Sequence, residues 1–471
     1  MNFVNKHVNG LEEMKILHGF TSGAGQPPQI ARAQRDLGFH SVSMHIGANK
    51  MGFEFDRVID KANYIDRGEI FSELINEFNV FHFYAFPLFG WKNKLNFPFG
   101  IDLLLLKLLK LPVIMNFRGS EVRQKDLFDN YARYSFAEGE DHGLFKSFPS
   151  EEQRKYIELC KNLCTKIIVP DAELASYVPG AKIIPRAIDI NKWKNYGQIN
   201  STKPLIVHAP TRRHVKGTSY ILKAVDRLKE KGLKFDFRLV EGLSNEDAAA
   251  VYARSDIIID QLKIGWHGVL STEAMALGKV AMCYIREDLV DSLKFDGQLP
   301  LINVNEDTLE VELESIILNS HRRIEIGNRA RAYVERTHAL DVVAKQLINL
   351  YSEATNEISS SVEIKVDCAI DLMKLYCTSL QLDKEKINSL AAKISRLNGV
   401  GKIDASLASK AVKTIERENS RDIFLKAVKY EAAGERKEAC VEYEKLLKHP
   451  DSIYSNKKYL KSKLNYLKLI L

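Results

Sequence analysis

Apolar and polar positions in the middle of the chain predict strands that alternate with helices. Residues 205–207 form a short apolar run, which is typical of a buried strand, and residues 218–228 repeat apolar side chains with a period of about 3.6, which predicts a helix. The same alternation then predicts strand, helix and strand at 257–259, 272–277 and 280–284. Gly278 is a natural end for the second helix, because glycine readily adopts the left-handed conformation. This order favours a parallel α/β sheet.

The amino-terminal half shows the same alternation and begins with a βαβ unit. A strand leads into a glycine loop at Gly23 and Gly25, then into a helix that carries Ile30, and then into a second strand from Ser41. No third glycine completes a dinucleotide-binding fingerprint, so a dinucleotide site is a weak interpretation. Further strands and helices are predicted at 80–86, 101–111, 112–123 and 165–193. Both halves therefore belong to the α/β class.

The carboxyl-terminal part has a different pattern. Beyond a polar linker at 352–361, nearly every segment has helical periodicity. Residues 424–450 resemble one helical hairpin of a tetratricopeptide repeat, with Ala439, Tyr443 and Leu446 on one face. A single hairpin cannot build a solenoid, so we expect a small all-α appendage that packs on itself or on a protein partner. Its last helix, with leucines on one face and lysines near the other, could rest on an anionic membrane, although an ordinary packed helix is favoured.

Length and composition agree with this division. A chain of 471 residues has enough core for two domains and an appendage, which we place at 1–195, 196–355 and 362–471. Hydrophobic residues make up 45% and charged residues 27%, as in soluble globular proteins. Residues 1–10 lack the apolar core of a signal peptide, and lysines interrupt the apolar stretch 103–111, which is too short to span a bilayer. A cytoplasmic protein is expected, with peripheral contact at a membrane as an option.

Cysteine, histidine and charge usage narrow the choice of ligands. The six cysteines form no C-x-x-C pair and are expected to be reduced, and the twelve histidines form no spaced cluster, so no metal site is expected. Residues 361–471 contain 22 lysines and arginines against 15 aspartates and glutamates, which accounts for the whole net charge of +7. The α/β part is therefore neutral, and no nucleic-acid partner is expected.

A cationic loop lies between the strand at 205–207 and the helix that follows it. Arg212, Arg213, Lys216 and Gly217 stand where the chain enters the helix, so side-chain cations and free helical N–H groups can face one anion. A diphosphate leaving group needs such neutralisation. An exposed, solvated charge cluster is the alternative, and this loop alone does not decide between them.

A glycine loop precedes the helix predicted at 272–277. Gly265 and Gly268 allow the backbone to approach a ligand closely, and Thr272 or the serine before it can cap the helix. Glu273 then lies in the first helical turn, where it could grip a ribose while the helix end holds an anion. The alternative is that Glu273 only complements the helix dipole. His267 in this loop, like the histidine of the cationic loop, could touch phosphate or sugar.

These motifs resemble those of a known enzyme family. Residues 1 to about 355 resemble a GT-B glycosyltransferase of the large, mostly retaining glycosyltransferase group 1 family, in which R-x-x-K-G is followed by E-G-F-G-x-x-x-x-E-A-M-A-x-G. The matching residues are Arg213, Lys216 and Gly217, then the segment GWHGVLSTEAMALG, which contains Glu273 and Gly278. The resemblance implies two Rossmann-like domains that face a cleft, with the acceptor on the amino-terminal side and a nucleotide-diphosphate sugar on the other.

The resemblance also implies individual roles. Arg213 and Lys216 would bind the pyrophosphate of the donor, and Glu273 would bind the ribose hydroxyls. No metal or other cofactor would be obligatory, because cationic side chains and helix ends neutralise the leaving group. The loop at Gly23 and Gly25 would line the cleft near the transferred sugar and the acceptor.

Two departures from the family pattern stand out. The first of the family's paired glutamates falls on Gly265, so the carboxylate that usually contacts the donor sugar is missing. Asp260 or Gln261 could replace it, the donor sugar could differ, or activity could be lost. Where the family often has H-G-S-D, this chain has Arg118, Gly119, Ser120 and Glu121. Arg118 could bind an acceptor or a phosphate, or it could be satisfied by Glu121 or by carbonyls.

The sequence therefore predicts an enzyme that transfers a hexose-type sugar to a hydroxyl group. The acceptor would be a polysaccharide, a glycolipid or other lipid-linked glycan, or a protein, and retention of configuration would follow the family. Two alternatives remain open. One is a nucleotide-sugar epimerase or hydrolase of the same fold, and the other is a non-catalytic scaffold that binds a protein partner through its helical tail.

Overall fold

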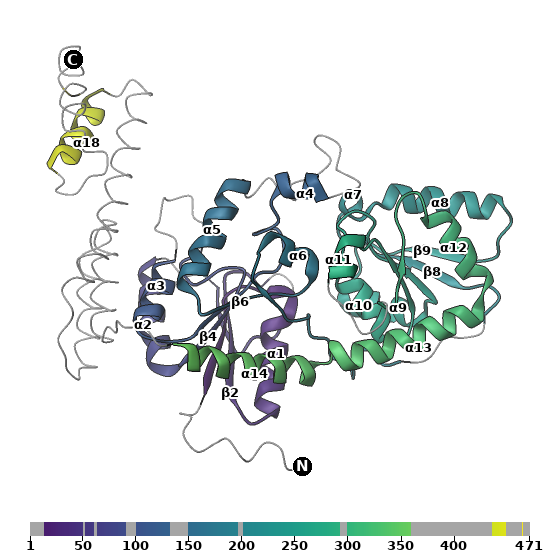
Figure 1. Cartoon of the computed structure of the whole chain (residues 1–471), viewed down its shortest axis with the longest axis horizontal. Helices are drawn as coiled ribbons and strands as arrows, with labels where there is room; N and C mark the ends of the chain where they lie inside the picture. The colour runs from purple at the N-terminus through teal and green to yellow at the C-terminus, as the bar shows by residue number, and fades with distance from the viewer. Residues whose placement is uncertain are drawn as a thin grey trace.

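The chain forms two parallel α/β units that lie next to each other (Figure 1). The structure is a computed structural model, and it describes residues 14–49, 52–60, 64–90, 100–131, 149–195, 201–292, 299–358, 436–448 and 464. The first unit is built on a seven-stranded sheet and the second on a five-stranded sheet. All strand pairs within the described part are parallel, as the alternation of strands and helices predicts.

The sheet of the first unit has the strand order β3-β2-β1-β4-β5-β6-β7. Its strands are β1 (Lys15–Gly19), β2 (His40–Ile46), β3 (Arg57–Ile59), β4 (Val80–Tyr84), β5 (Val113–Asn116), β6 (Lys166–Val169) and β7 (Lys182–Ile183). The helices between them are α1 (Gln26–Asp36), α2 (Tyr64–Glu77), α3 (Ile101–Leu108), α4 (Lys125–Tyr131), α5 (Ser150–Leu163) and α6 (Ala172–Tyr177). Strands are therefore covered by helices on both faces, as in a doubly wound sheet.

Alternation along each strand divides the core into two layers. On β1, Leu17 faces the cluster that includes Phe71 of α2, while Ile16 faces the cluster that includes Ile30 of α1. Successive side chains of a strand point to opposite faces, so both become buried when helices cover both faces. The continuous apolar runs that predicted these strands are explained by this double burial.

The second unit repeats the plan with the strand order β12-β11-β10-β8-β9. Its strands are β8 (Leu205–His208), β9 (Asp236–Leu239), β10 (Ile257–Ile259), β11 (Val280–Cys283) and β12 (Ile302–Asn303). Its helices are α7 (Arg213–Lys216), α8 (Thr218–Glu230), α9 (Asn245–Arg254), α10 (Val269–Ala276), α11 (Glu287–Ser292), α12 (Leu309–Leu318) and α13 (Ser320–Thr337). The strands predicted around 205, 257 and 280 are confirmed, and Gly278 has the expected positive φ of 69° after α10.

The chain crosses between the units twice, and the two crossings are hydrogen-bonded to each other. The amide of Ile188 donates to the carbonyl of His338 at 2.8 Å, and the amide of Leu340 donates to the carbonyl of Ile188 at 3.2 Å. The returning chain forms α14 (Leu340–Glu357), which packs against α1 and lies along the first unit in Figure 1. The hydroxyl of Tyr351 lies 2.6 Å from Nδ1 of buried His82. The first unit therefore has its last helix supplied by the chain that leaves the second.

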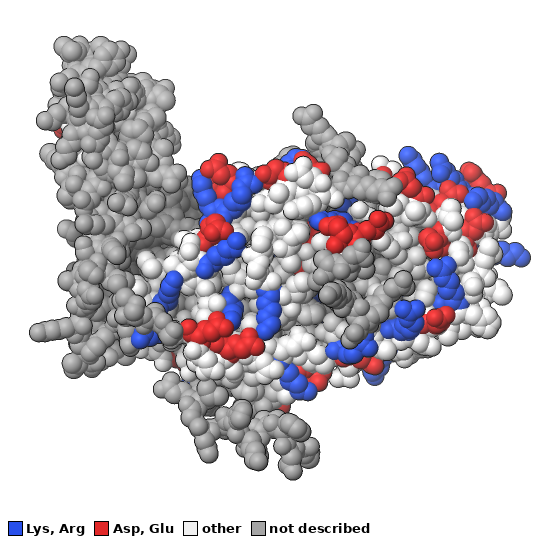
Figure 2. Space-filling model, in the orientation of Figure 1, with Lys and Arg blue, Asp and Glu red and all other residues white. Residues whose placement is uncertain are grey.

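The helical tail is described only in part. Helix α18 (Arg436–Lys448) buries Ala439, Tyr443 and Leu446, which confirms the predicted apolar face. The rest of the predicted hairpin and the final lysine-rich helix lie outside the described residues. None of the helices that the structure describes combines the length and the apolar character needed to cross a membrane. On the face shown in Figure 2, lysines and arginines lie beside aspartates and glutamates over both units.

Candidate functional site

An ion pair between Lys216 and Asp260 lies at the centre of the predicted donor loops. Lys216 ends α7, and its Nζ donates to Oδ1 of Asp260 at 2.5 Å and to Oε1 of Gln261 at 3.1 Å. The side chain of Lys216 is 15% exposed, whereas that of Asp260 is fully buried. Gly217 follows with a φ of 73°, and a Cβ there would lie 3.0 Å from Leu262, so the turn favours glycine. The cationic loop is thus joined to the carboxyl end of β10.

Asp260 also holds the glycine loop. Its Oδ2 accepts from the amide of Gly268 at 2.9 Å and from Oγ of Ser271 at 2.7 Å. Burial acts to raise the pKa of Asp260, but the charge and hydrogen bond of Lys216, with the bonds from Ser271 and Gly268, bring that pKa below its ordinary value. The carboxylate is therefore ionised and fully partnered, so it is not placed to replace the missing family glutamate in contact with a sugar.

Helix α10 begins earlier than the sequence predicts. Its first residue is Val269 and its N-cap is Gly268, which makes no side-chain capping bond, so the predicted caps on Thr272 or Ser271 are wrong. Ser271 donates to Asp260 instead, and Oγ1 of Thr272 donates to the carbonyl of Gly268 at 3.2 Å. Within the described ranges, the amides of Val269 and Leu270 have no acceptor. These free N–H groups form the positive end of the helix.

Glu273 therefore lies in the second turn of α10 rather than in the first. Its side chain is partly buried and makes no hydrogen bond or ion pair with any residue that the structure describes. Burial raises the pKa of Glu273 to about 8, the charge of Asp260 adds to this effect, and Lys192 and Lys216 oppose it. A helix dipole acts mainly on the first turn, so it does not account for this carboxyl group. A partly buried, unpartnered carboxyl group is a candidate ligand-binding group.

The structure separates the cations of the basic loop. Arg212, Arg213 and His214 are exposed, whereas Lys216 turns inward. The guanidinium of Arg213 forms a bidentate pair with Glu241 on the surface, with Nε to Oε1 at 2.8 Å. In this arrangement Lys216 is the cation of the loop that faces the glycine loop, since a Cβ on Gly268 would lie 3.4 Å from its Nζ.

Gly265 occupies a position that does not suit a larger residue. Its φ is 91°, and a Cβ there would lie 2.7 Å from Cγ and Cδ of Arg286. Arg286 pairs with Asp288 at 2.8 Å, and its guanidinium lies 4.3 Å from the ring centroid of Tyr131, on helix α4 of the first unit. The space beside the missing family glutamate is thus filled by an arginine that contacts both units.

His267 is also placed at the boundary between the units. It is buried, and burial lowers its pKa to about 4, so its ring is neutral at pH 7. The ring lies 5.8 Å from that of His338, whose Nδ1 lies 2.8 Å from the carbonyl oxygen of Arg186. His267 therefore adjoins the segment that connects the two units.

On the first unit, Arg118 follows the carboxyl end of β5. Glu121 accepts hydrogen bonds from the amides of Arg118 and Gly119, so it satisfies the backbone of this loop. The guanidinium of Arg118 makes no hydrogen bond or ion pair with another described residue. Burial, with the nearby charge of Arg186, lowers the pKa of Arg118 to about 10, where it is still cationic at neutral pH. The structure therefore does not contain the alternative in which Glu121 satisfies the side chain of Arg118.

The glycine loop of the first unit is tightly packed. Gly23 and Gly25 form a short 3₁₀ turn before α1, and both have positive φ. A Cβ on Gly23 would lie 3.2 Å from the ring of Tyr84, and a Cβ on Gly25 would lie 2.7 Å from the ring of Phe53. Glycine at these positions therefore lets the turn lie against aromatic rings at the carboxyl edge of the sheet.

Sequence reasoning missed several residues of this region. Asp260 was considered only as a sugar contact, although a carboxylate directly after a buried strand was a signal for a role in positioning the loops. Arg186, Arg286 and His338 were not proposed, because their neighbours come from distant segments of the chain. Among the described residues, no three histidine, cysteine, aspartate or glutamate side chains are grouped so as to hold a metal ion.

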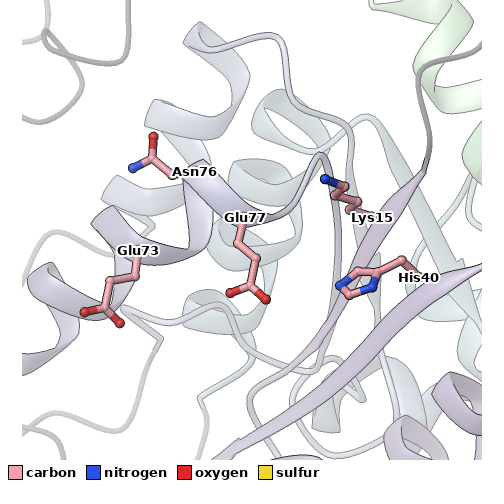
Figure 3. Close-up of a pocket in the computed structure, with 5 residues that line it drawn as sticks. All are labelled: Lys15, His40, Glu73, Asn76 and Glu77. Carbon is pink, nitrogen blue, oxygen red and sulfur yellow. The ribbon is translucent and has the colours of Figure 1, made fainter. Parts of the chain in front are cut away.

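A surface pocket of about 530 Å³ lies elsewhere in the first unit (Figure 3). Its lining residues are Lys15, His40, Glu73, Asn76 and Glu77. Lys15 and His40 begin strands β1 and β2, so the pocket is at the amino ends of the strands. Ligands of doubly wound sheets bind at the carboxyl ends, where the predicted site residues lie.

Solved structures show similar folds. The chain is similar to a glycosyltransferase from Rickettsia africae ESF-5, with 14% identity over 74% of this chain and 100% of that one, and a TM-score of 0.51. Sucrose-phosphate synthase from Thermosynechococcus elongatus matches with 12% identity over 72% of this chain and 98% of that one, and a TM-score of 0.49. HepE from Anabaena in complex with UDP and glucose matches with 11% identity over 72% and 100%, and a TM-score of 0.46.

Sequence comparisons add no further match. No protein-family model matches this sequence, and no curated protein matches it significantly. At 14% identity a structural likeness shows the fold alone, because one fold can host many activities. The two parallel-sheet α/β units and their helices, with this likeness, give the chain the GT-B fold.

Proposed function

We propose that this protein is a glycosyltransferase that moves a sugar from a nucleotide-diphosphate sugar to a hydroxyl group of a glycan, lipid-linked or protein acceptor. One observation carries this function. At the carboxyl edge of the second sheet, the inward cation Lys216 lies beside a helix start with free amides, and Glu273 lies one turn further along that helix without a partner. The Rickettsia africae protein with the same fold is named a glycosyltransferase.

In this proposal the donor diphosphate binds at Lys216 and the first turn of α10. Lys216 supplies a cation held in place by Asp260, and the amides of Val269 and Leu270 supply N–H donors. These donors are aimed at the oxygen atoms on which negative charge grows as the sugar leaves. Arg213 assists only after it exchanges its pair with Glu241 for the diphosphate.

Glu273 binds the ribose in this scheme. A carboxylate that accepts hydrogen bonds from two ribose hydroxyls is favoured in its ionised form. The free protein holds Glu273 mostly protonated at neutral pH, since burial raises its pKa to about 8. Nucleotide binding would therefore remove a proton from Glu273, and this release can be measured.

The transfer step breaks the bond between the sugar anomeric carbon and the diphosphate oxygen and forms a bond to the acceptor hydroxyl oxygen. With retention of configuration, as in the mostly retaining family that the motif resembles, the departing phosphate takes the proton of the acceptor hydroxyl. The products are a glycoside and a nucleoside diphosphate. Arg286 of the second unit lies over Tyr131 of the first, and exclusion of water between the units would favour transfer over hydrolysis.

A panel of UDP-, GDP- and ADP-sugars tests this function. Calorimetry and nucleotide release are measured for the wild type, Lys216→Met, Glu273→Gln and the matched control Lys229→Met, which changes an exposed lysine of α8. The transferase is supported if the wild type binds one donor and releases its nucleotide. Lys216→Met and Glu273→Gln should abolish both properties, and Lys229→Met should retain them. An altered sugar without an acceptor product supports the epimerase or hydrolase instead. Absence of binding to every donor contradicts the donor site and favours a scaffold.

A further inference from the structure

The geometry points to an oxyanion subsite on the first unit, in which Arg118, with Arg186 nearby, binds a carboxylate or phosphate group carried by the sugar acceptor. This subsite presupposes the sugar transfer proposed above and names the class of acceptor for it. The acceptor would be an acidic glycan, such as one with a uronic acid, or a phosphorylated one.

Arg118 is at the right edge of the sheet for an acceptor. It follows β5 directly, and the carboxyl ends of neighbouring parallel strands carry Tyr84 on β4 and, just past β6, Asp171. Arg186 comes after β7, and its carbonyl oxygen lies 2.8 Å from Nδ1 of His338 in the returning crossing. This edge therefore adjoins the second unit, where the donor sugar would lie.

The carboxylates around Arg118 are committed to other groups. Glu121 accepts from two backbone amides of the same loop. Asp171 pairs with Arg186 at 2.9 Å and caps α6 by accepting from the amide of Leu174 at 2.9 Å. Glu173 forms a bidentate pair with Arg123, with both distances at 2.7 Å. No carboxylate is therefore in a direct ion pair or hydrogen bond with the guanidinium of Arg118, although the charges of Glu121 and Asp171 act on it from nearby.

A partly buried guanidinium without hydrogen-bond partners binds oxyanions in preference to neutral groups. It offers five N–H donors in a planar fork, which fits the two oxygen atoms of a carboxylate or phosphate. Burial without hydrogen-bond partners is unfavourable for a cation, so an incoming oxyanion gains more here than on an open surface. A neutral sugar hydroxyl would form weaker hydrogen bonds with the guanidinium than an oxyanion does. The second cation nearby, Arg186, is already paired with Asp171, so Arg118 is the group that would bind the anion.

The donor's own diphosphate is the other source of an oxyanion, and it can be separated by experiment. Lys216 and the start of α10 serve the diphosphate on the second unit, whereas Arg118 belongs to the first. Substitution of Arg118 should therefore weaken acidic acceptors and leave nucleoside diphosphates unaffected.

Ligand-observed NMR titration tests this assignment with matched probes. Methyl β-D-glucuronide is compared with methyl β-D-glucoside, and glucose 6-phosphate with glucose, while UDP, GDP and ADP report the donor site. The proteins are wild type, Arg118→Gln, Arg118→Lys, and Arg154→Gln as a control for loss of an exposed arginine of the first unit. We expect at least one acidic probe to bind wild type about tenfold more tightly than its neutral counterpart. Arg118→Gln should abolish that difference, Arg118→Lys should retain part of it, and Arg154→Gln should leave it intact.

Two outcomes would overturn the subsite. One is equal affinity of wild type for the acidic and neutral members of both pairs. The other is a loss of nucleoside diphosphate binding in Arg118→Gln as large as in Lys216→Met, which would place Arg118 in the donor site. If Arg118→Gln does not fold, Arg118→Lys and the wild-type comparison still decide. Binding of acidic probes does not require transfer, so it can succeed when the transferase activity fails, and the two results are distinguishable.

Discussion

The two units differ in how their charged side chains are paired. On the second unit, Lys216 and Asp260 neutralise each other, and Asp260 also ties the glycine loop through Gly268. On the first unit, the guanidinium of Arg118 makes no ion pair or hydrogen bond with a residue that the structure describes, and the neighbouring carboxylates bond to other groups. In the proposed reaction the donor side would thus be organised before a ligand arrives, whereas the acceptor side would be completed by one. Preorganised charge favours catalysis, and unmatched charge favours selection of a substrate.

The largest effect is expected from removing the cation of the organised side. Lys216→Met leaves Asp260 buried without its counter-ion, which should lower the free energy of unfolding by about 3–5 kcal/mol. Nucleotide affinity should fall by about a hundredfold or more because the diphosphate loses a charge-assisted contact. Chemical denaturation and calorimetry measure both effects. The double variant Lys216→Met/Asp260→Asn should recover stability but not affinity, and a single variant as stable as wild type would contradict the paired arrangement.

The next effect concerns protons at Glu273. Its folded pKa, at about 8, is higher than its unfolded value near 4.5, so the folded state binds more protons between these values. The contribution of Glu273 to the free energy of unfolding is therefore fully present below pH 4.5. It is lost as the pH rises toward 8, by about 1.4 kcal/mol per pH unit at most. Denaturation curves at several pH values should therefore show a steeper loss for wild type than for Glu273→Gln.

The same group should release protons when a nucleotide binds. Calorimetry at pH 7 in buffers of different ionisation enthalpy should show up to about one proton released by wild type. Glu273→Gln should release none and bind more weakly. Equal proton release by both proteins would show that Glu273 does not contact the ribose.

A smaller effect is expected at Gly265, which stands where the resembling family has a glutamate. Gly265→Ala adds a Cβ at 2.7 Å from Arg286 in a backbone conformation with a φ of 91°, which should cost about 1–3 kcal/mol of stability. Gly242→Ala is a matched control, because its φ of 69° is also positive but a Cβ there meets nothing within 4 Å. Thermal denaturation should show the larger loss for Gly265→Ala. Equal losses would mean that Arg286 moves aside easily.

The smallest effect is expected at Arg213. Its guanidinium is exposed and paired with Glu241, so Arg213→Gln should leave stability unchanged. Nucleotide affinity should fall by about three- to tenfold, since Arg213 must give up Glu241 before it assists the diphosphate. Calorimetry at low and moderate salt checks this value. A loss as large as that of Lys216→Met would show that Arg213 turns into the cleft when the donor binds.

The fold could be predicted from the sequence because buried parallel strands produce continuous apolar runs. The strand predicted at 257–259 matches β10, and the α/β alternation gives both sheets. The start of α10 was misplaced, because Gly268 acts as N-cap without a side chain and Ser271 donates to Asp260 instead. The boundaries of the units stay a prediction, since helical periodicity in 340–357 does not show on which sheet the helix packs.

The candidate site could be predicted on one side only. Lys216 and Glu273 lie in contiguous motifs with a clear resemblance, although their roles remain proposals. The surroundings of Arg118 come from loops after three different strands, so no local pattern shows that its neighbours are already engaged. Arg213 pairs with a residue 28 positions away, a choice that the sequence of its own loop does not reveal.

Helix α14 determines to which unit the rest of the chain is attached. The hydroxyl of Tyr351 on α14 contacts His82 of β4. This contact joins residues that are 269 positions apart and holds the helix against the first sheet. The chain beyond residue 358 therefore continues from the first unit. If the second unit swings relative to the first, α14 therefore stays with the unit that carries Arg118. If the tail binds a partner, the anchoring of α14 would hold that partner on the first unit, to which the proposed reaction assigns the acceptor.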